Sequence, residues 1–286
     1  MSCQVQKSLP STTVNAEGID ARGNMILLGK STRERLQQEP FAGWFNKNYA
    51  EYKVDSTTAD MIKSRLRNKR FVIFMGTWCG DSRQEVPKMY KLLDYCEVPG
   101  TNIQLINLNM YDSVYKQSPG REEKGLNIHR VPDLLVFEND KEIGRIIEKP
   151  VTSWENDLLA IVLQEKYEPN YKIVTYLQTL FRVVPEKEIE KDIAKIADSL
   201  KSHISKNEGL QSFATVLLAT NEVVKALIVY RLNTMLYPDA ANGFVALGDA
   251  YLKKGERTMA KESYTRALSI EPGHEKATAM LAQLMR

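Results

Sequence analysis

The stretch Arg70-Phe-Val-Ile-Phe-Met-Gly-Thr-Trp-Cys-Gly-Asp-Ser-Arg-Gln-Glu-Val-Pro87 joins an apolar run to a cysteine at the start of a helix. Residues 71–75 are uninterrupted apolar side chains, rich in aromatic and β-branched types, which predicts a buried central strand. Gly76 ends this run, and a helix is predicted from the turn at Cys79 through to Cys96. Cys79 then lies where unpaired backbone N–H groups and the helix dipole favour a thiolate.

The surroundings of Cys79 resemble the thioredoxin family. Trp78-Cys79-Gly80 matches that family's Trp-Cys-Gly, and Pro87 falls eight residues after the cysteine, where the family kinks this helix. Ser82 stands where the family has its second cysteine. The resemblance implies thiol–disulfide exchange with Cys79 as the catalytic residue and no cofactor. The residues expected to support this site are Trp78, Gly80, Asp81, Ser82, Val131 and Pro132.

The order of the predicted elements is that of the thioredoxin fold, an α/β fold with a central mixed β-sheet flanked by helices. The elements are a helix at 57–68, a strand at 71–75, the helix after Cys79, strands at 102–108, 131–137 and 142–147, and a helix at 153–164. Ser56 is the expected N-cap of the first helix, and Thr152 with Glu155 forms a capping box at the last. The resemblance covers roughly residues 50–166.

The N-terminal part of the chain departs from that pattern. Residues 1–20 are polar without an apolar period, which predicts a disordered tail. Residues 21–167 are expected to form the thioredoxin-like domain with an N-terminal helical extension. In that extension, residues 33–52 carry apolar side chains at roughly helical intervals, and Trp44 and Phe45 belong either to the core or to a ligand-stacking surface.

Cys79 alone supports only half of a dithiol mechanism. A thiolate attacks a substrate disulfide, and a second thiol then resolves the mixed disulfide. Ser82 cannot do so, because a hydroxyl forms no disulfide. Cys96 lies 17 residues along the same helix, about 25 Å away at the standard rise, and is expected to be a small buried apolar residue. The sequence therefore predicts one-thiol chemistry resolved by glutathione, another external thiol or a partner protein; the alternative is that Cys79 is an inert remnant.

By resemblance, the bond between Val131 and Pro132 is cis and Pro132 lies against the sulfur of Cys79. The backbone of this strand is then expected to pair with an extended substrate segment. The family's buried acid, six residues before the first cysteine, is replaced here by Ile73. This departure predicts slower proton transfer than in the family.

Charged residues near Cys79 act in both directions. Asp81 and Asp133 are expected to destabilise the Cys79 thiolate, whereas Arg83 and Arg130 are expected to stabilise it. The sequence does not show whether the combined effect of these four charges favours the thiolate or opposes it. His129 is either a proton carrier near the sulfur or a histidine at a strand end with no such role.

Composition narrows the function classes. The 286 residues carry a net charge of +3, which gives no reason to expect a nucleic-acid partner, and no apolar run is long enough to span a bilayer. The three cysteines form no disulfide framework and the three histidines are scattered, so no metal site is predicted. Two locations stay open: the sequence as given reads as cytoplasmic, and Cys3 would anchor a bacterial cell-envelope lipoprotein if an upstream signal had been removed.

After a break at 168–170 the chain turns all-helical, and residues 171–286 are expected to form an α-helical domain. A helix beginning at Pro185 carries an apolar face through to Leu200. Further on, three residues recur 34 positions later, as Ala226 and Ala260, Tyr230 and Tyr264, and Pro238 and Pro272.

The segment 241–274 resembles a tetratricopeptide repeat, with 207–240 a degenerate copy and 275–286 a capping helix. The residues that match the repeat pattern are Phe244, Leu247, Gly248, Tyr251, Ala260, Tyr264, Ala267 and Pro272. The repeats either cover their own neighbours or offer a groove for a peptide or helix of a partner.

Two functions follow from these features. The first is a thioredoxin-like thiol-redox protein whose helical repeats recruit a protein client that carries a disulfide or thiol. The second is a non-redox adaptor in which both parts form a protein-interaction module. The reactivity of Cys79 separates the two.

Overall fold

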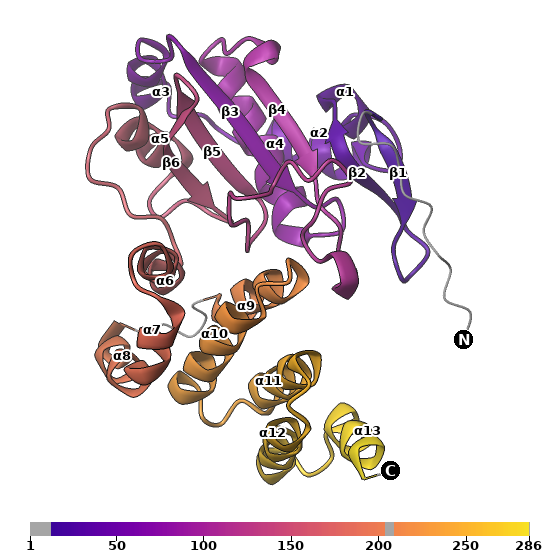
Figure 1. Ribbon diagram of the computed structural model, residues 1–286. Helices are drawn as coiled ribbons and strands as arrows, with labels where there is room; N and C mark the ends of the chain where they lie inside the picture. The colour runs from indigo at the N-terminus through magenta and orange to yellow at the C-terminus, as the bar shows by residue number, and fades with distance from the viewer. Residues whose placement is uncertain (1–12, 204–208, 286) are drawn as a thin grey trace. The chain divides into compact units, whose positions relative to one another are not determined.

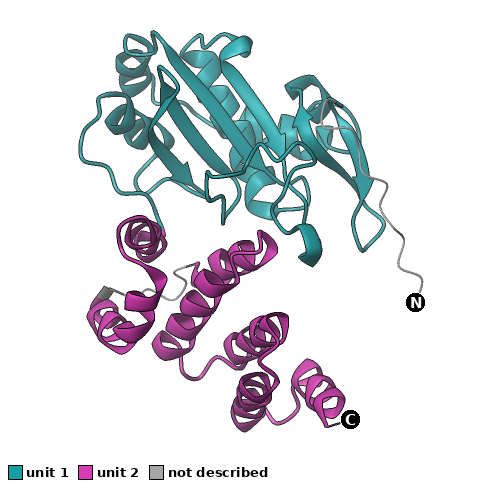
Figure 2. Cartoon of the chain, viewed as in Figure 1, with its two compact units in different colours: residues 1–170 teal, residues 171–286 magenta. Residues whose placement is uncertain are grey.

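The computed structural model describes residues 13–203 and 209–285, which belong to two compact units divided between Asn170 and Tyr171 (Figure 2). The first unit is a mixed α/β unit, and the described part of the second is helical, as predicted at this level. Cys3, most of the predicted tail and the start of the predicted first repeat near residue 207 lie outside the described residues. Within those residues, no helix has the length and apolar character required to cross a membrane.

The first unit is built on a mixed sheet of six strands in the order β1-β2-β4-β3-β5-β6 (Figure 1). β3 runs parallel to β4 and antiparallel to β5, and the hairpins β1–β2 and β5–β6 form the two edges. The strands are β1 (Ala16–Ile19), β2 (Met25–Ser31), β3 (Lys69–Met75), β4 (Ile103–Asn107), β5 (Asp133–Glu138) and β6 (Lys141–Ile147).

β3 carries its continuous apolar run because both faces of the sheet are covered. Phe71, Ile73 and Met75 pack on one face, where helices supply most of the partners. Val72 and Phe74 pack on the other, against residues of the long connection between β4 and β5. The helices of this unit are α1 (Arg33–Leu36), α2 (Ala42–Glu51), α3 (Ser56–Lys63), α4 (Gly80–Tyr95) and α5 (Trp154–Val162).

The prediction of a disordered tail over residues 1–20 is wrong for the part that the structure describes, because β1 lies in it and forms a hairpin with β2. One carboxylate oxygen of Asp20 accepts the backbone N–H groups of Arg22 and Asn24, both at 2.8 Å, and closes the turn. Gly23 takes the positive φ of 82° that this turn requires. Thr77 anchors the hairpin beside the central strand, since its hydroxyl accepts the Leu27 N–H at 3.0 Å. The extension before β3 is therefore a hairpin followed by helices, and not helical alone.

Two predicted caps are also corrected. Asp55, not Ser56, caps α3, because its carboxylate accepts the Thr57 N–H at 3.1 Å, and the helix ends earlier than predicted, at Lys63. Ser153, not Thr152, caps α5, with its hydroxyl accepting the Asn156 N–H at 3.1 Å.

The aromatic residues of α2 belong to the core. Phe45 is fully buried, and Trp44 is partly buried against the same cluster. The interpretation of these two residues as core is confirmed.

The second unit is a succession of helix pairs around one apolar cluster. The helix predicted from Pro185 to Leu200 is interrupted at Asp192, which separates α7 from α8. α10 and α12 begin 34 residues apart, the spacing at which the sequence repeats. The helices are α6 (Lys172–Val183), α7 (Glu186–Lys191), α8 (Ile193–Leu200), α9 (Leu210–Ala219), α10 (Val223–Leu236), α11 (Ala241–Lys254), α12 (Arg257–Ile270) and α13 (Glu275–Leu284).

Gly248 lets α11 and α12 pack closely. A Cβ at this position would lie 2.7 Å from the ring of Tyr264, a fully buried side chain held by a 2.6 Å bond from its hydroxyl to Asp249. Gly248→Ala is expected to lower the stability of the helical unit by about 1–3 kcal/mol through overpacking. Gly273→Ala is the control, because an added Cβ there meets nothing within 4 Å. Denaturant titration of both variants checks this, and equal midpoints would contradict it.

Candidate functional site

Cys79 is the N-cap residue of α4. Its N–H donates to the Gly76 carbonyl at 2.9 Å, and its own carbonyl accepts the Arg83 N–H at 3.1 Å, so the turn after β3 leads directly into the helix. The side chain is half-buried. The thiol therefore lies at the positive end of the dipole of a 16-residue helix while a part of it stays accessible.

The loop that enters β5 lies against this sulfur. The bond between Val131 and Pro132 is cis, as predicted, and the Cys79 thiol donates to the Val131 carbonyl at 3.4 Å. The Pro132 carbonyl accepts the Glu148 N–H at 2.6 Å, which fixes this loop to the segment after β6. Val131 and Pro132, more than fifty residues after Cys79 in the sequence, are thus brought to the cysteine by the loop that enters β5.

Ser82 lies one turn further along α4 and is fully buried. Its hydroxyl accepts the Gly76 N–H at 3.3 Å rather than a bond from the Cys79 thiol. Gly80 has open space at its Cα, since an added Cβ would meet nothing within 4 Å. Ser82 therefore stabilises the turn, and the position of Gly80 is open on the side where a Cβ would point.

Trp78 covers the side of the site formed by the β4–β5 connection. Its indole N–H donates to the Leu108 carbonyl at 2.8 Å, and the ammonium of Lys116 lies 5.2 Å from its ring centre. Trp78 and Cys79 pack together against the same apolar cluster. Lys116 was not predicted, because nothing in the sequence marks a lysine of a long loop as buried.

Both acids that were expected to oppose a thiolate have cationic partners. Asp81 pairs with Lys149 at 3.0 Å, and Asp133 pairs with Arg145 at 3.2 Å. The two arginines are also engaged: Arg83 donates to the Thr77 carbonyl at 2.6 Å, and Arg130 pairs with Glu148 at 3.5 Å. Pairing reduces the net field of these acids at the sulfur, which the sequence could not reveal.

Asp133 follows Pro132 and is a fully buried carboxyl. Arg145 bonds one of its oxygens, while the other has no hydrogen-bond partner among the described residues. Burial raises the pKa of Asp133 from 3.8 to about 7, and the nearby Arg145 opposes that rise. His129 is also fully buried, and burial lowers its pKa to about 3, so its imidazole is neutral near pH 7. A neutral ring does not add positive charge near Cys79.

The raised pKa of Asp133 predicts a pH-dependent stability. The folded state holds this proton more tightly than the unfolded chain, so stability is full below about pH 4 and is lost as pH rises through about 7. Relative to the Asp133→Asn variant, the free energy of unfolding of the wild type should fall by on the order of a few kcal/mol as the pH rises across this range. Denaturant titrations of both proteins between pH 4 and 9 measure the difference, in which the effect of His129 cancels. A difference independent of pH would contradict the prediction.

Cys96 lies at the opposite end of α4 and is buried, as predicted. Its thiol lies 3.5 Å from the Ala59 carbonyl, and burial raises its pKa to about 11. The length of the helix, about 24 Å for 16 residues, separates it from Cys79. Cys96 cannot resolve a disulfide at Cys79 within the folded chain.

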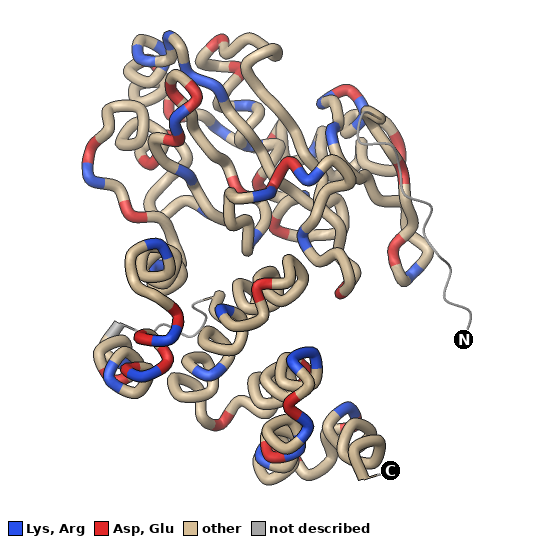
Figure 3. Tube along the Cα trace, viewed as in Figure 1, with Lys and Arg blue, Asp and Glu red and all other residues tan. Residues whose placement is uncertain are grey.

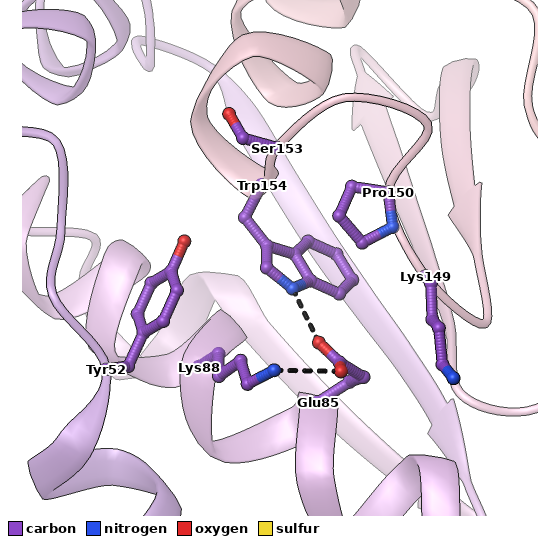
Figure 4. A pocket seen from close by; sticks show the side chains of 7 residues that line it. All are labelled: Tyr52, Glu85, Lys88, Lys149, Pro150, Ser153 and Trp154. Atoms are coloured by element: carbon purple, nitrogen blue, oxygen red, sulfur yellow. Dashed lines mark hydrogen bonds and ion pairs between the residues drawn. The ribbon is translucent and has the colours of Figure 1, made fainter.

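The buried acid nearest to the site along α4 is Glu85, which the sequence reasoning missed. Its carboxylate accepts the indole N–H of Trp154 at 2.9 Å and pairs with Lys88 at 2.9 Å (Figure 4). A hollow of about 330 Å³ lies beside these residues. One feature of the sequence could have indicated that Glu85 is buried: it directly precedes Val86, one of the apolar residues that α4 buries. Ile73 is buried among apolar side chains and supplies no acid.

Among the described residues, no group of three or more histidine, cysteine, aspartate or glutamate side chains is arranged to hold a metal ion. No protein-family model matches this sequence, and a comparison with curated proteins finds no significant match.

Proposed function

We propose that this protein is a thioredoxin-like thiol-exchange protein that acts through Cys79 alone and depends on an external thiol for release. One observation carries the proposal: a half-exposed cysteine caps a long helix and lies 3.4 Å from the carbonyl before a cis-proline. The helix end favours negative charge on sulfur. The order of strands and helices around it supports the thioredoxin-like assignment.

The proposed reaction is two successive exchanges. The Cys79 thiolate attacks a disulfide of the client, so that a new S–S bond forms, the old one breaks, and the leaving client thiolate takes up a proton. An external thiolate, such as that of glutathione, then attacks the mixed disulfide and releases Cys79. In each step one disulfide bond breaks and one forms, so the number of disulfides does not change. The external thiol supplies the sulfur that Ser82 lacks.

The helical unit is proposed to be a tetratricopeptide array that recruits the client. The 34-residue spacing of α10 and α12 supports this, together with the close packing of Gly248 on Tyr264. Arrays of this kind present extended surfaces to partners.

Reaction with oxidised glutathione tests the proposal. We expect the full chain to acquire glutathione on Cys79, identified by mass spectrometry of its peptides, and a Cys79→Ser variant to acquire none there. Cys96 should stay unmodified in the folded protein, because it is buried and its pKa is raised. Absence of the adduct at Cys79, or equal modification of Cys96, would contradict the proposal.

A second candidate function is a non-redox adaptor. The observation in its favour is that the Cys79 thiol donates a hydrogen bond to the Val131 carbonyl, which occupies the sulfur with a contact inside the chain. An adaptor would capture its client equally well with Cys79→Ser, whereas the exchange protein loses covalent capture.

A further inference from the structure

A groove runs along the side of α4 that faces solvent. It consists of two adjoining hollows of about 330 and 450 Å³ that share Tyr52, and we call it the α4 groove. α4 contributes the row Glu85, Lys88, Lys91 and Asp94, whose three-residue spacing places them on one side of the helix. The residues before α3 and after β6 form its walls, as Figure 4 shows for the first hollow.

The acidic side chains of the α4 groove are already neutralised. Glu85 binds Lys88 and the Trp154 indole. Asp94 forms an ion pair with Arg33 at 2.7 Å and accepts a hydrogen bond from the hydroxyl of Tyr49 at 2.6 Å. Neither carboxylate is therefore available to repel an acidic ligand.

Two lysines of the groove have no carboxylate partner among the described residues. Lys91 donates to the Ala50 carbonyl at 3.0 Å and lies 5.4 Å from the ring centre of Tyr49. Lys53 is exposed. Over the described residues, acidic and basic side chains are interspersed (Figure 3). Two lysines without carboxylate partners, in a hollow that three tyrosines also line, are therefore a local feature. They favour an acidic ligand with apolar or aromatic side chains.

Cys79 does not line the α4 groove, but one residue of the first hollow connects the groove to the turn that carries Cys79. Lys149 lines this hollow and pairs with Asp81, two residues after the cysteine. From Cys79 to Asp94 the helix rises about 22 Å, a distance that about seven residues of an extended peptide span. An extended chain with one residue at Cys79 is therefore long enough to reach the second hollow, which Lys53 and Lys91 both line.

We propose that the α4 groove binds an acidic, extended segment of the client protein, with glutamate or aspartate side chains on Lys53 and Lys91. The acidic residues lie about four to seven positions from the client cysteine that reacts with Cys79. The inference rests on the proposed exchange at Cys79 for the role of the client, but binding itself needs no cysteine.

Binding is measured on the full chain carrying Cys79→Ser, with a short fluorescent peptide that contains glutamates and a tyrosine. Lys53→Glu with Lys91→Glu is expected to weaken binding at least about tenfold, with a matching loss of salt dependence. The control reverses the same number of charges at Lys124 and Lys141, which are exposed and do not line the groove, and should bind as before.

If both pairs of charge reversals weakened binding equally, the peptide would be attracted by net charge alone, and the proposed binding in the α4 groove would be wrong. Tighter binding of a neutral apolar peptide, or displacement of the acidic peptide by an oligonucleotide of equal charge, would overturn the class of partner. The exchange proposal is judged separately by glutathione on Cys79 in the unaltered chain. Peptide binding without that adduct would remove the exchange function and leave the groove.

Discussion

Ser82→Cys is expected to convert the protein into one that resolves its own mixed disulfides. The new sulfur would stand one helical turn from Cys79, at a position that is already buried and ordered by the Gly76 N–H. Well-oriented groups react as though present at about 10⁵ M or more, so release without an external thiol should rise by at least about a hundredfold. Reduction of insulin disulfides by an added dithiol, monitored by turbidity, measures the gain.

The cost of this substitution is small and has a matched control. Replacing the hydroxyl weakens its bond to Gly76, worth about 1 kcal/mol. Ser82→Ala loses the same bond without adding a thiol and should keep the exchange behaviour of the wild type. If the cysteine variant forms no disulfide with Cys79 and gains no reductase activity, Cys79 does not lie at a working exchange site.

Arg145→Met is expected to lower the stability of the first unit strongly. Arg145 bonds Asp133 at 3.2 Å, the Leu126 carbonyl at 2.9 Å, and Glu142 through two nitrogens at 2.7 Å. Removing it leaves Asp133 buried without its partner, which costs about 3–5 kcal/mol when the carboxyl is ionised. The loss should be greatest above pH 7 and smaller as Asp133 takes up its proton.

Two further variants make this result specific. Arg145→Met combined with Asp133→Asn should recover much of the loss, because no charge is then buried unpaired. Arg70→Met removes a half-exposed arginine that lies 3.6 Å from Asp140, and should cost about 1 kcal/mol or less. Denaturant titration at two pH values compares all three, and equal losses for Arg70 and Arg145 would contradict the account.

The centre of the sheet and the position of Cys79 could be predicted because local sequence determines them. β3 is apolar on both faces, and the glycine after it marks the turn into α4. The N-terminal hairpin could not be predicted in this way. β1 is four residues long and contains a charged residue, and β2 is placed by pairing with β4 more than seventy residues away. Its turn depends on side-chain bonds of Asp20 that composition does not reveal.

The charges of the candidate site were identified as residues but not as pairs. The sequence suggests that Asp81 and Asp133 lie near the cysteine. It does not show their partners: Arg145, in β6, pairs with Asp133, and Lys149, in the segment after β6, pairs with Asp81. Only the antiparallel pairing of β5 with β6 brings Arg145 to Asp133. The sign of the field at the sulfur is thus a property of tertiary structure, out of reach of spacing rules.

The most direct test of the account follows the fate of glutathione on Cys79. The protein is first loaded with oxidised glutathione, excess reagent is removed, and the adduct on Cys79 is quantified over time with and without added reduced glutathione. We predict that the adduct persists alone and is released by the added thiol, because neither Ser82 nor Cys96 can resolve it. An adduct that never forms at Cys79, or one that is lost equally fast without added thiol, would contradict the account.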